Sequence, residues 1–222
     1  MVPSRTRHLV ARAAREAVAH YCARITRDGL VTGTAGNLSA RDGDLLAITP
    51  SGMAYELITP ERVCVVRIED GVQVDGEFAP ASELPLHLAA LRATGEGAVV
   101  HTHSLAATAV ASIEGLTELP NIHYYTAMFG GPLRITEYAR YGTSELAERV
   151  AAALEGRTGA LMGQHGAVVV GDDLHQAYDK ALVVEWLAQL WLMASQAGTP
   201  KILPQEEIDA VMVAIRGYGQ RP

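Results

Sequence analysis

Cysteine is scarce in this chain, with two residues, Cys22 and Cys64, among 222. Cys22 falls in a segment with helical periodicity and Cys64 in an apolar segment typical of a strand, so we expect two buried thiols rather than a disulfide. Basic residues are also in the minority, because 18 lysines and arginines stand against 25 aspartates and glutamates, a formal net charge of −7. This balance offers no basic surface for nucleic acid and favours a small-molecule partner.

Long apolar runs are missing as well. The longest, roughly Ala181 to Ala194, is interrupted by Glu185 and Gln189 and is too short to span a bilayer. The N-terminal segment carries no apolar run ahead of a cleavage site, so we expect no export signal, no membrane partner and a cytoplasmic protein. With 49% hydrophobic residues, the chain suffices for one well-filled core, and we expect a single domain over residues 1–222.

Hairpins and helices without a regular βαβα alternation favour an α/β sandwich around a mostly antiparallel sheet. Asp42-Gly43 and Asp70-Gly71 supply the positive φ of tight turns between apolar segments. A helix apolar on all sides must be covered everywhere, which is typical of a subunit contact or of a central helix in one domain. That helix is 173–197; the other expected helices are 4–27, 82–93, 105–112 and 143–155, and the expected strands are 37–41, 45–49, 63–68, 72–74, 99–103, 160–162 and 167–170.

Two histidines at the end of an apolar segment carry the strongest chemical signal. His101 and His103 follow three apolar residues, and side chains two apart on a strand point to the same face, where two imidazoles can chelate one divalent ion. His165 is the candidate third ligand, because flanking glycines permit a sharp bend that presents its ring. Glu83 is a candidate acid/base, and His87, one helical turn later, could brace it, although packing is the favoured interpretation. If the three histidines and Glu83 converge, the chain is a metal-dependent enzyme.

Two polar, glycine-bearing segments flank the first predicted hairpin. Gly33-Thr34-Ala35-Gly36-Asn37 precedes its first strand and Thr49-Pro50-Ser51-Gly52 follows its second, so the hairpin brings the two segments near each other. Backbone amides, the Asn37 amide and a serine hydroxyl could hold a phosphate without lysine, although each segment alone is also typical of an ordinary turn. No Gly-Lys-Ser/Thr loop and no Rossmann glycine pattern is present, so we do not expect nucleotide binding.

Five ordered motifs together resemble the class II L-fuculose-1-phosphate aldolase family, which includes ribulose-5-phosphate 4-epimerases, over nearly the whole chain. The motifs are Gly33-Thr34-Ala35-Gly36-Asn37-Leu38-Ser39, Thr49-Pro50-Ser51-Gly52, Ser82-Glu83, His101-Thr102-His103-Ser104 and Gln164-His165-Gly166. The resemblance implies a three-layer α/β/α fold and a homotetramer with active sites between subunits. It also implies one Zn²⁺ per subunit, although another divalent metal would suit the same ligands.

The resemblance assigns roles to individual residues. The implied metal ligands are His101, His103, His165 and Glu83. Glu83 ligates the metal in the free enzyme and then serves as acid/base. The residues that match phosphate contacts of the family are Gly36, Asn37, Ser51, Gly52 and Ser82.

Two tyrosines and one alanine complete the comparison with the family. Tyr124 matches the proton donor to the nascent alkoxide, and Tyr218 matches a second tyrosine near the C-terminus. In the relatives both reach the site of a neighbouring subunit. Ala81 is a departure, because the fuculose enzyme has a serine there, so one phosphate-binding hydroxyl is missing.

The expected reaction is reversible cleavage of L-fuculose 1-phosphate, or a similar ketose 1-phosphate, into dihydroxyacetone phosphate and an aldehyde. An aldolase stabilises its enediolate by a lysine Schiff base or by a divalent metal. Lys180 and Lys201, the two lysines of the chain, lack the surroundings expected of a desolvated nucleophile, which favours the metal, with Glu83 exchanging the C3 proton.

Three alternatives to the aldolase are left open. The first is a metal-dependent dehydratase or decarboxylase acting on a related phosphate such as methylthioribulose 1-phosphate. The second is a 4-epimerase, disfavoured because those relatives carry aspartate at the position of Glu83. The third is a non-catalytic scaffold like the adducin head, disfavoured because the metal-site residues are all present.

Overall fold

A central β-sheet runs through the computed structural model, which describes residues 9–215. Within these residues the strands are β1 (Asn37–Asp42), β2 (Leu45–Ile48), β3 (Cys64–Arg67), β4 (Gln73–Asp75), β5 (Ala98–Thr102), β6 (Glu118–Leu119), β7 (Leu133–Thr136), β8 (Gly159–Met162) and β9 (Gly166–Gly171). Their order in the sheet is β4-β3-β2-β1-β5-β9-β8-β7-β6. Neighbouring strands are antiparallel except for β7 and β8, which pair in parallel.

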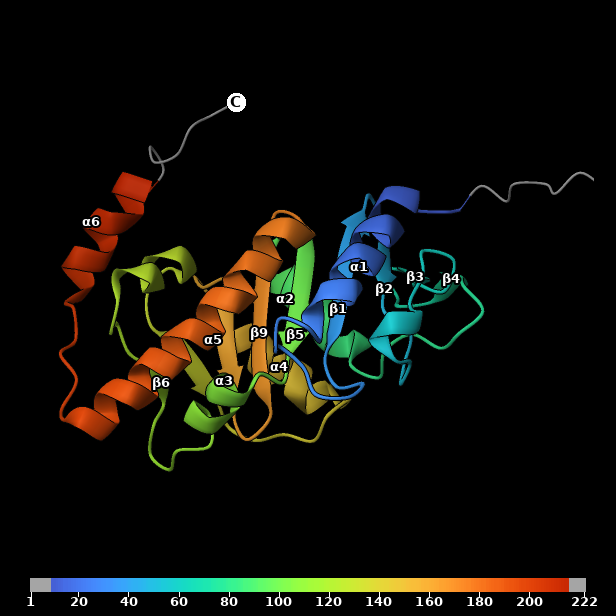
Figure 1. Ribbon diagram of the computed structural model, residues 1–222. Coiled ribbons are helices and arrows are strands. Elements are labelled where there is room, and N and C mark those ends of the chain that lie inside the picture. Colours follow the sequence, from blue (N-terminus) through green and yellow to red (C-terminus); the bar gives the residue numbers. More distant parts are fainter. Residues whose placement is uncertain (1–8, 216–222) are drawn as a thin grey trace, which may run out of the picture.

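Helices cover both faces of the sheet, which makes three layers (Figure 1). They are α1 (Arg12–Ile25), α2 (Leu84–Thr94), α3 (Leu105–Val110), α4 (Ser144–Ala153), α5 (Leu174–Ala197) and α6 (Gln205–Ile215), with 3-10 turns η1 (Tyr55–Leu57) and η2 (Tyr124–Phe129). Helices α1, α3 and α5 share one apolar core, which contains Val100, and α2 and α4 share the other, which contains Val99. Consecutive residues of β5 therefore serve opposite faces. The predicted α/β/α sandwich around a mostly antiparallel sheet is confirmed.

The two predicted Asp-Gly hairpins are present. Strand β1 pairs with β2, and β3 pairs with β4 across a register shift. Gly43 and Gly71 in their turns have φ values of 60° and 72°, the left-handed region that glycine enters freely. The pairing of β1 with β5 places Asn37 directly opposite His101, so the start of β1 and the end of β5 lie together.

The predicted boundaries differ from the structure at short or exposed elements. The first helix, expected from residue 4, begins at Arg12 in the structure, and residues 1–8 lie outside its described part. Strands β6 and β7, of two and four residues, are too short to show a period. Helix α6 buries Ile208 and leaves most of its other described side chains at least partly exposed, so it has no broad apolar stripe to reveal it.

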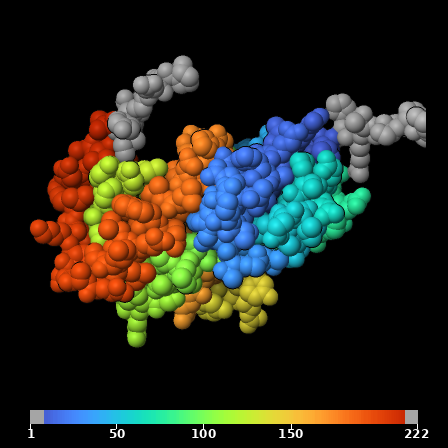
Figure 2. Space-filling view, viewed as in Figure 1, coloured from blue at the N-terminus to red at the C-terminus, as the bar shows by residue number. Residues whose placement is uncertain are grey.

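Helix α5 is the helix expected to be apolar on all sides. It packs on the sheet and buries Leu187, while Trp186 and Met193 are 43% and 69% exposed. Its one carboxylate in the apolar stretch, Glu185, accepts hydrogen bonds at 3.0 Å from two free N–H groups in the first turn of α3, those of Ala106 and Ala107. Helices α5 and α1 form adjoining parts of one molecular face (Figure 2). The exposed flank of α5 is where the predicted subunit contact would form.

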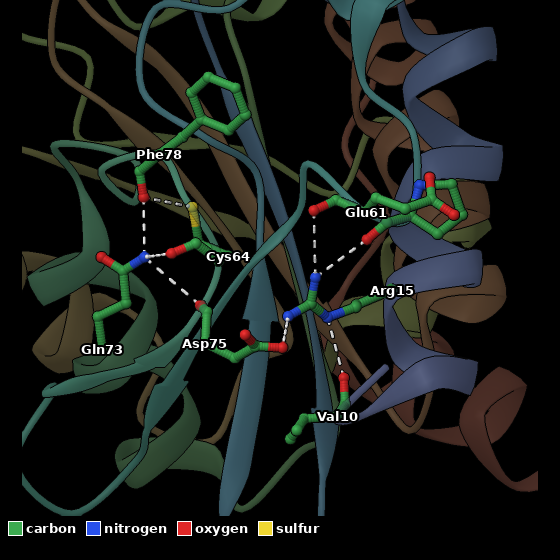
Figure 3. A network of polar contacts seen from close by, with 9 residues as sticks. Val10, Arg15, Glu61, Cys64, Gln73, Asp75 and Phe78 are labelled. Atoms are coloured by element: carbon green, nitrogen blue, oxygen red, sulfur yellow. Dashed lines mark hydrogen bonds and ion pairs between the residues drawn. The ribbon is translucent and has the colours of Figure 1, made fainter. Parts of the chain in front are cut away.

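A buried arginine ties α1 to the edge of the sheet (Figure 3). Arg15 is 1% exposed, and its Nη2 donates to Oδ2 of Asp75 at 2.6 Å. Beside this pair, Sγ of Cys64 donates to the carbonyl oxygen of Phe78 at 3.1 Å. Cys64 and Cys22 are both buried and free, as predicted. Among residues 9–215, no helix combines the length and the apolar character needed to cross a membrane.

Candidate metal centre and cleft

Four side chains with metal-binding atoms meet where strand β5 ends. His101 lies in β5 and His103 just beyond it, His165 lies in the turn between β8 and β9, and Glu83 immediately precedes α2. One ligand atom of each lies within 4.8 Å of those of the other three. Because β9 pairs with β5, the sheet itself carries the His165 turn beside His101. The structure thus brings together the four residues that the sequence singled out.

The rings of the histidines face the carboxylate of Glu83. Nε2 of His101 lies 3.0 Å from Oε2 of Glu83 and 3.0 Å from Nε2 of His103, and Nε2 of His165 lies 3.3 Å from Oε1 of Glu83. Nδ1 of His101 donates to the carbonyl oxygen of Ala167 at 2.9 Å. This bond orients the ring and leaves Nε2 facing the cluster, the arrangement found in histidines that ligate metals.

Burial and neighbouring charges shift the pKa values of the four groups in the cluster. Burial alone would lower the pKa of His101, but Glu83 raises it above its ordinary value. Burial, with His101 and His165, lowers the pKa of His103 to about 3, and burial with His101 lowers that of His165 to about 4. Burial alone would raise the pKa of Glu83, but His101 and a hydrogen bond from Asn37 hold it well below its ordinary range. Glu83 is therefore ionised and two histidines are neutral, the forms that ligate metals.

This donor set fits a divalent metal ion. Three imidazoles and a carboxylate are nitrogen and oxygen ligands that Zn²⁺ accepts. Oε1 of Glu83 is buried and, although Nε2 of His165 lies 3.3 Å away, makes no hydrogen bond among residues 9–215. A buried carboxylate oxygen without a hydrogen bond is costly, and a cation at the cluster would compensate it.

Two glycines let the His165 turn approach the sheet. A Cβ at Gly166 would lie 2.0 Å from the carbonyl oxygen of Thr102, and one at Gly163 would lie 2.5 Å from that of Thr136. The residue with left-handed backbone is Gln164, with φ 54°, which is uncommon for a residue other than glycine. The predicted role of the glycines is thus corrected, since they permit close backbone approach while Gln164 makes the bend.

A cleft of about 310 Å³ opens beside the cluster. All five residues that the resemblance assigns to phosphate line it, namely Gly36, Asn37, Ser51, Gly52 and Ser82. The β1–β2 hairpin brings the first four together, and Ser82 joins them because it precedes Glu83. Gly36 has φ 79°, and a Cβ there would lie 2.8 Å from the carbonyl oxygen of His101, so this crossing of β5 requires glycine.

Two tyrosines that no sequence motif singled out also line the cleft. Tyr138 and Tyr141 lie between β7 and α4 and are 57% and 66% exposed. Exposed aromatic side chains at a cleft offer contact area to a ligand. The sequence signal for them was weak, because neither belongs to a periodic segment.

Tyr124, the predicted proton donor, does not line this cleft. It lies in η2, is 45% exposed, and its ring lies beside those of His123 and Tyr125. It borders a different, largely apolar groove of about 910 Å³ between η2, α5 and α6. Tyr218, the other predicted tyrosine, lies outside the described residues. A role for Tyr124 in the chemistry therefore requires a neighbouring subunit and stays a prediction.

The expectation that Lys180 is not desolvated is wrong. Lys180 is 7% exposed, its Nζ donates to the carbonyl oxygen of Val170 at 3.0 Å, and burial lowers its pKa despite Glu96 and Asp172. It does not line the cleft, however, and Val170 lies near the end of β9 away from the His165 turn. Location, rather than solvation, separates Lys180 from the candidate metal centre.

The chain is similar in sequence and in fold to known proteins. Residues 16–192 match the family described as class II aldolase and adducin N-terminal domain. A 5-methylthioribulose-1-phosphate/5-deoxyribulose-1-phosphate aldolase of Rhodospirillum rubrum is 39% identical over 197 residues, which are 88% of this chain and 87% of the relative. The L-fuculose phosphate aldolase of Escherichia coli K12 is 38% identical over 203 residues, 90% of this chain and 93% of the relative. A solved structure of an L-fuculose 1-phosphate aldolase superposes with a TM-score of 0.89 at 33% identity and covers 95% of this chain and 99% of that one.

Proposed function

The chain belongs to the family of class II aldolases and is an enzyme, a lyase of that family, and from this premise we propose that it reversibly cleaves a ketose 1-phosphate into dihydroxyacetone phosphate and an aldehyde. The observation that carries the proposal is the meeting of Glu83 with three histidines beside a cleft lined by neutral hydrogen-bond donors. The presence of all four residues argues against a non-catalytic scaffold.

The reaction requires a divalent metal ion, for which we propose Zn²⁺, with another divalent metal as the alternative. His101, His103, His165 and Glu83 would hold it. A metal ion bound there acts as a Lewis acid that polarises the ketose carbonyl and stabilises the negative charge of the enediolate. Since the chain belongs to a metal-dependent family, this role suits its donor set.

Glu83 is the proposed acid/base. In the condensation direction its carboxylate removes a proton from C3 of dihydroxyacetone phosphate, and the enediolate then forms a C–C bond to the aldehyde carbonyl carbon. In cleavage the bond between C3 and C4 breaks, its electron pair stays with C3, and Glu83 returns the proton to C3. His101 and Asn37 keep Glu83 ionised, so the carboxylate is ready to accept the proton.

Neutral groups hold the phosphate in this proposal. Ser51 and Ser82 offer hydroxyls, and Gly36 and Gly52 offer backbone amides. The N–H of Ser51 already donates to Ala79 at 2.9 Å, which leaves its hydroxyl for the substrate. The structure thus supports a phosphate site with few redundant donors.

Asn37 and Ala81 limit that phosphate site further. One amide hydrogen of Asn37 goes to Glu83 at 2.9 Å, which leaves the other for phosphate. Ala81 lines the same cleft without a hydroxyl, so it adds no donor where the fuculose enzyme has one. Each remaining contact should therefore carry a large share of the phosphate affinity.

Protonation of the aldehyde oxygen is assigned to Tyr124 of a neighbouring subunit, with Tyr218 at the same site. This assignment requires a homotetramer whose active sites lie between subunits. Three observations support it: Tyr124 is 45% exposed, it borders a largely apolar groove, and Met193 on the adjoining α5 is 69% exposed. Large exposed apolar surfaces are typical of subunit contacts.

The relatives narrow the proposed substrate class. The names of the relatives reported above include the phosphates of L-fuculose, 5-deoxyribulose and methylthioribulose. The terminal carbon of each of these sugars bears no free hydroxyl. All are named aldolases, which favours aldol cleavage over dehydration, decarboxylation or 4-epimerisation. We propose a ketose 1-phosphate with an apolar terminus, L-fuculose 1-phosphate among the first to test.

The decisive experiment is a substrate panel with trapping of the product. The purified protein is incubated with L-fuculose, 5-deoxyribulose and methylthioribulose 1-phosphates, and released dihydroxyacetone phosphate is reduced enzymatically with NADH. We expect NADH oxidation with at least one substrate, its loss after chelation, and its return with Zn²⁺ or another divalent ion. Loss of water from a substrate without release of dihydroxyacetone phosphate would instead identify a dehydratase.

A further inference from the structure

A buried chain of polar side chains leads from the core to Glu83. Ser39 and His87 are 0% exposed and Asn37 is 4% exposed. Oγ of Ser39 lies 2.7 Å from Nδ1 of His87, and Nε2 of His87 is hydrogen-bonded to Oδ1 of Asn37. Nδ2 of Asn37 then donates to Oε2 of Glu83 at 2.9 Å. Burial of so many polar groups is costly unless all are satisfied, and here they form one connected network that ends at the carboxylate.

The hydrogens of this network all point toward Glu83. A carbonyl oxygen can only accept, so Nε2 of His87 carries the hydrogen that bonds Asn37. A neutral imidazole carries a single hydrogen, so with this hydrogen on Nε2 the Nδ1 atom accepts from the hydroxyl of Ser39. Ser39, His87 and Asn37 thus donate hydrogen bonds in series, and the last of them donates to the ionised carboxylate of Glu83.

We propose that His87 is a positioning residue for the acid/base Glu83, acting through the side-chain amide of Asn37; this inference rests on the proposed function. If the amide of Asn37 turned over, its carbonyl oxygen would face Oε2 of Glu83, and two acceptors would meet without a hydrogen. The same rotation would set an N–H of Asn37 against the N–H of His87. The Nε2–H of His87 thus holds the amide in the orientation that keeps the carboxylate of Glu83 hydrogen-bonded and fixed toward the cleft.

His87 does not line the cleft, so its effect on the reaction must pass through Asn37 and Glu83. Two substitutions of His87 can distinguish this role from simple packing. A packing residue needs only volume, whereas a positioning residue needs an N–H at the place of Nε2. Glutamine and methionine are matched for this purpose, because both are unbranched and similar in size and only glutamine can donate a hydrogen.

The test compares His87→Gln with His87→Met. The rate of deuterium exchange from solvent into C3 is measured at saturating metal with dihydroxyacetone phosphate and with unphosphorylated dihydroxyacetone. We expect His87→Gln to keep at least roughly a third of the parent rate and His87→Met to lose about 10- to 100-fold, the loss expected when a carboxylate loses one hydrogen-bond donor. The loss must appear with both donors, because the base acts on both, and any further loss through the phosphate contact proposed for Asn37 is confined to the phosphorylated donor. Metal content and thermal unfolding are recorded for each variant.

Equal exchange rates in the two variants would overturn the proposal, since only volume would then matter. A second readout needs no activity and no variant: nitrogen-15 NMR of the metal-free protein reports which nitrogen of His87 bears the proton. We expect the neutral form with hydrogen on Nε2, and hydrogen on Nδ1 would overturn the proposal even if His87→Met fails to fold. If the parent protein exchanges no proton at C3, the proposed function fails, while the NMR result still decides the orientation of the network.

Discussion

Replacement of Ser82 by alanine should weaken phosphate binding and change little else. Ser82 is exposed in the cleft and precedes Glu83, so its hydroxyl can be removed without opening a cavity in the core. Loss of one hydrogen bond to a charged group costs about 1.5 to 3 kcal/mol, or roughly 10- to 150-fold. We therefore expect KM for dihydroxyacetone phosphate to rise by about that factor while kcat stays nearly unchanged.

Asn37→Ala should behave differently, because Asn37 serves both the cleft and the base. Its Nδ2 donates to Oε2 of Glu83 at 2.9 Å, and Glu83 is only 5% exposed. The variant therefore loses the proposed phosphate contact and also a donor to a buried carboxylate. We expect a similar rise in KM together with a fall in kcat of roughly tenfold or more.

Steady-state rates with dihydroxyacetone phosphate and with dihydroxyacetone separate the two effects. The Ser82→Ala loss should be confined to the phosphorylated donor, whereas the kcat loss of Asn37→Ala should appear with both. Ala81→Ser, in the same cleft, is the matched control and should lower KM modestly if its hydroxyl reaches the phosphate. Equal losses of Ser82→Ala on both donors would refute a phosphate role, and an unchanged kcat in Asn37→Ala would refute a contribution of its bond to Glu83.

Three further predictions concern the metal centre and the assembly. Replacement of His101, His103 or His165 by alanine should lower zinc content and activity together, since a three-histidine site seldom keeps its geometry after losing a ligand, and full zinc occupancy in all three variants would contradict the assignment. The metal-free protein should lose stability as the pH falls from 6.5 toward 4, because the unfolded chain binds protons there that folded His165 and His103 accept only near their pKa values of about 4 and 3. The raised pKa of His101 has the opposite effect on stability, but only above pH 6.5. A thermal midpoint as high at pH 5 as at pH 7 would contradict this prediction. The protein should sediment as a tetramer, and a monomer at micromolar concentration would contradict the proposed intersubunit site.

Much of the fold could be predicted because its signals are local. The Asp-Gly turns fix two hairpins, and all five helices expected from the sequence are present as α1 to α5. Strands β6 and β7 could not be found in this way, because elements of two and four residues are too short to show a period. The burial of Lys180 was missed because a lysine on an apolar helix gives no sign of which face will be covered.

The residues of the candidate site could likewise be predicted only where the signal in the sequence is local. His101 and His103 could be paired from their spacing on a strand, but the approach of His165 depends on the β5–β9 pairing, which no local pattern encodes. The favoured interpretation of His87 was packing; its ring is indeed fully buried, yet it is also hydrogen-bonded at both nitrogens. Such a network becomes visible only when the partners that satisfy it are placed in space.

Glu83 is central to the proposed chemistry, and solvent deuterium exchange at C3 of dihydroxyacetone phosphate tests it most directly. The metal-loaded protein and its Glu83→Gln variant are compared, with metal content and unfolding measured for both. We predict that the parent incorporates deuterium without any aldehyde present, and that Glu83→Gln stays folded, keeps much of its metal and exchanges no proton. Exchange by Glu83→Gln at the parent rate would contradict the assignment of Glu83 as the base.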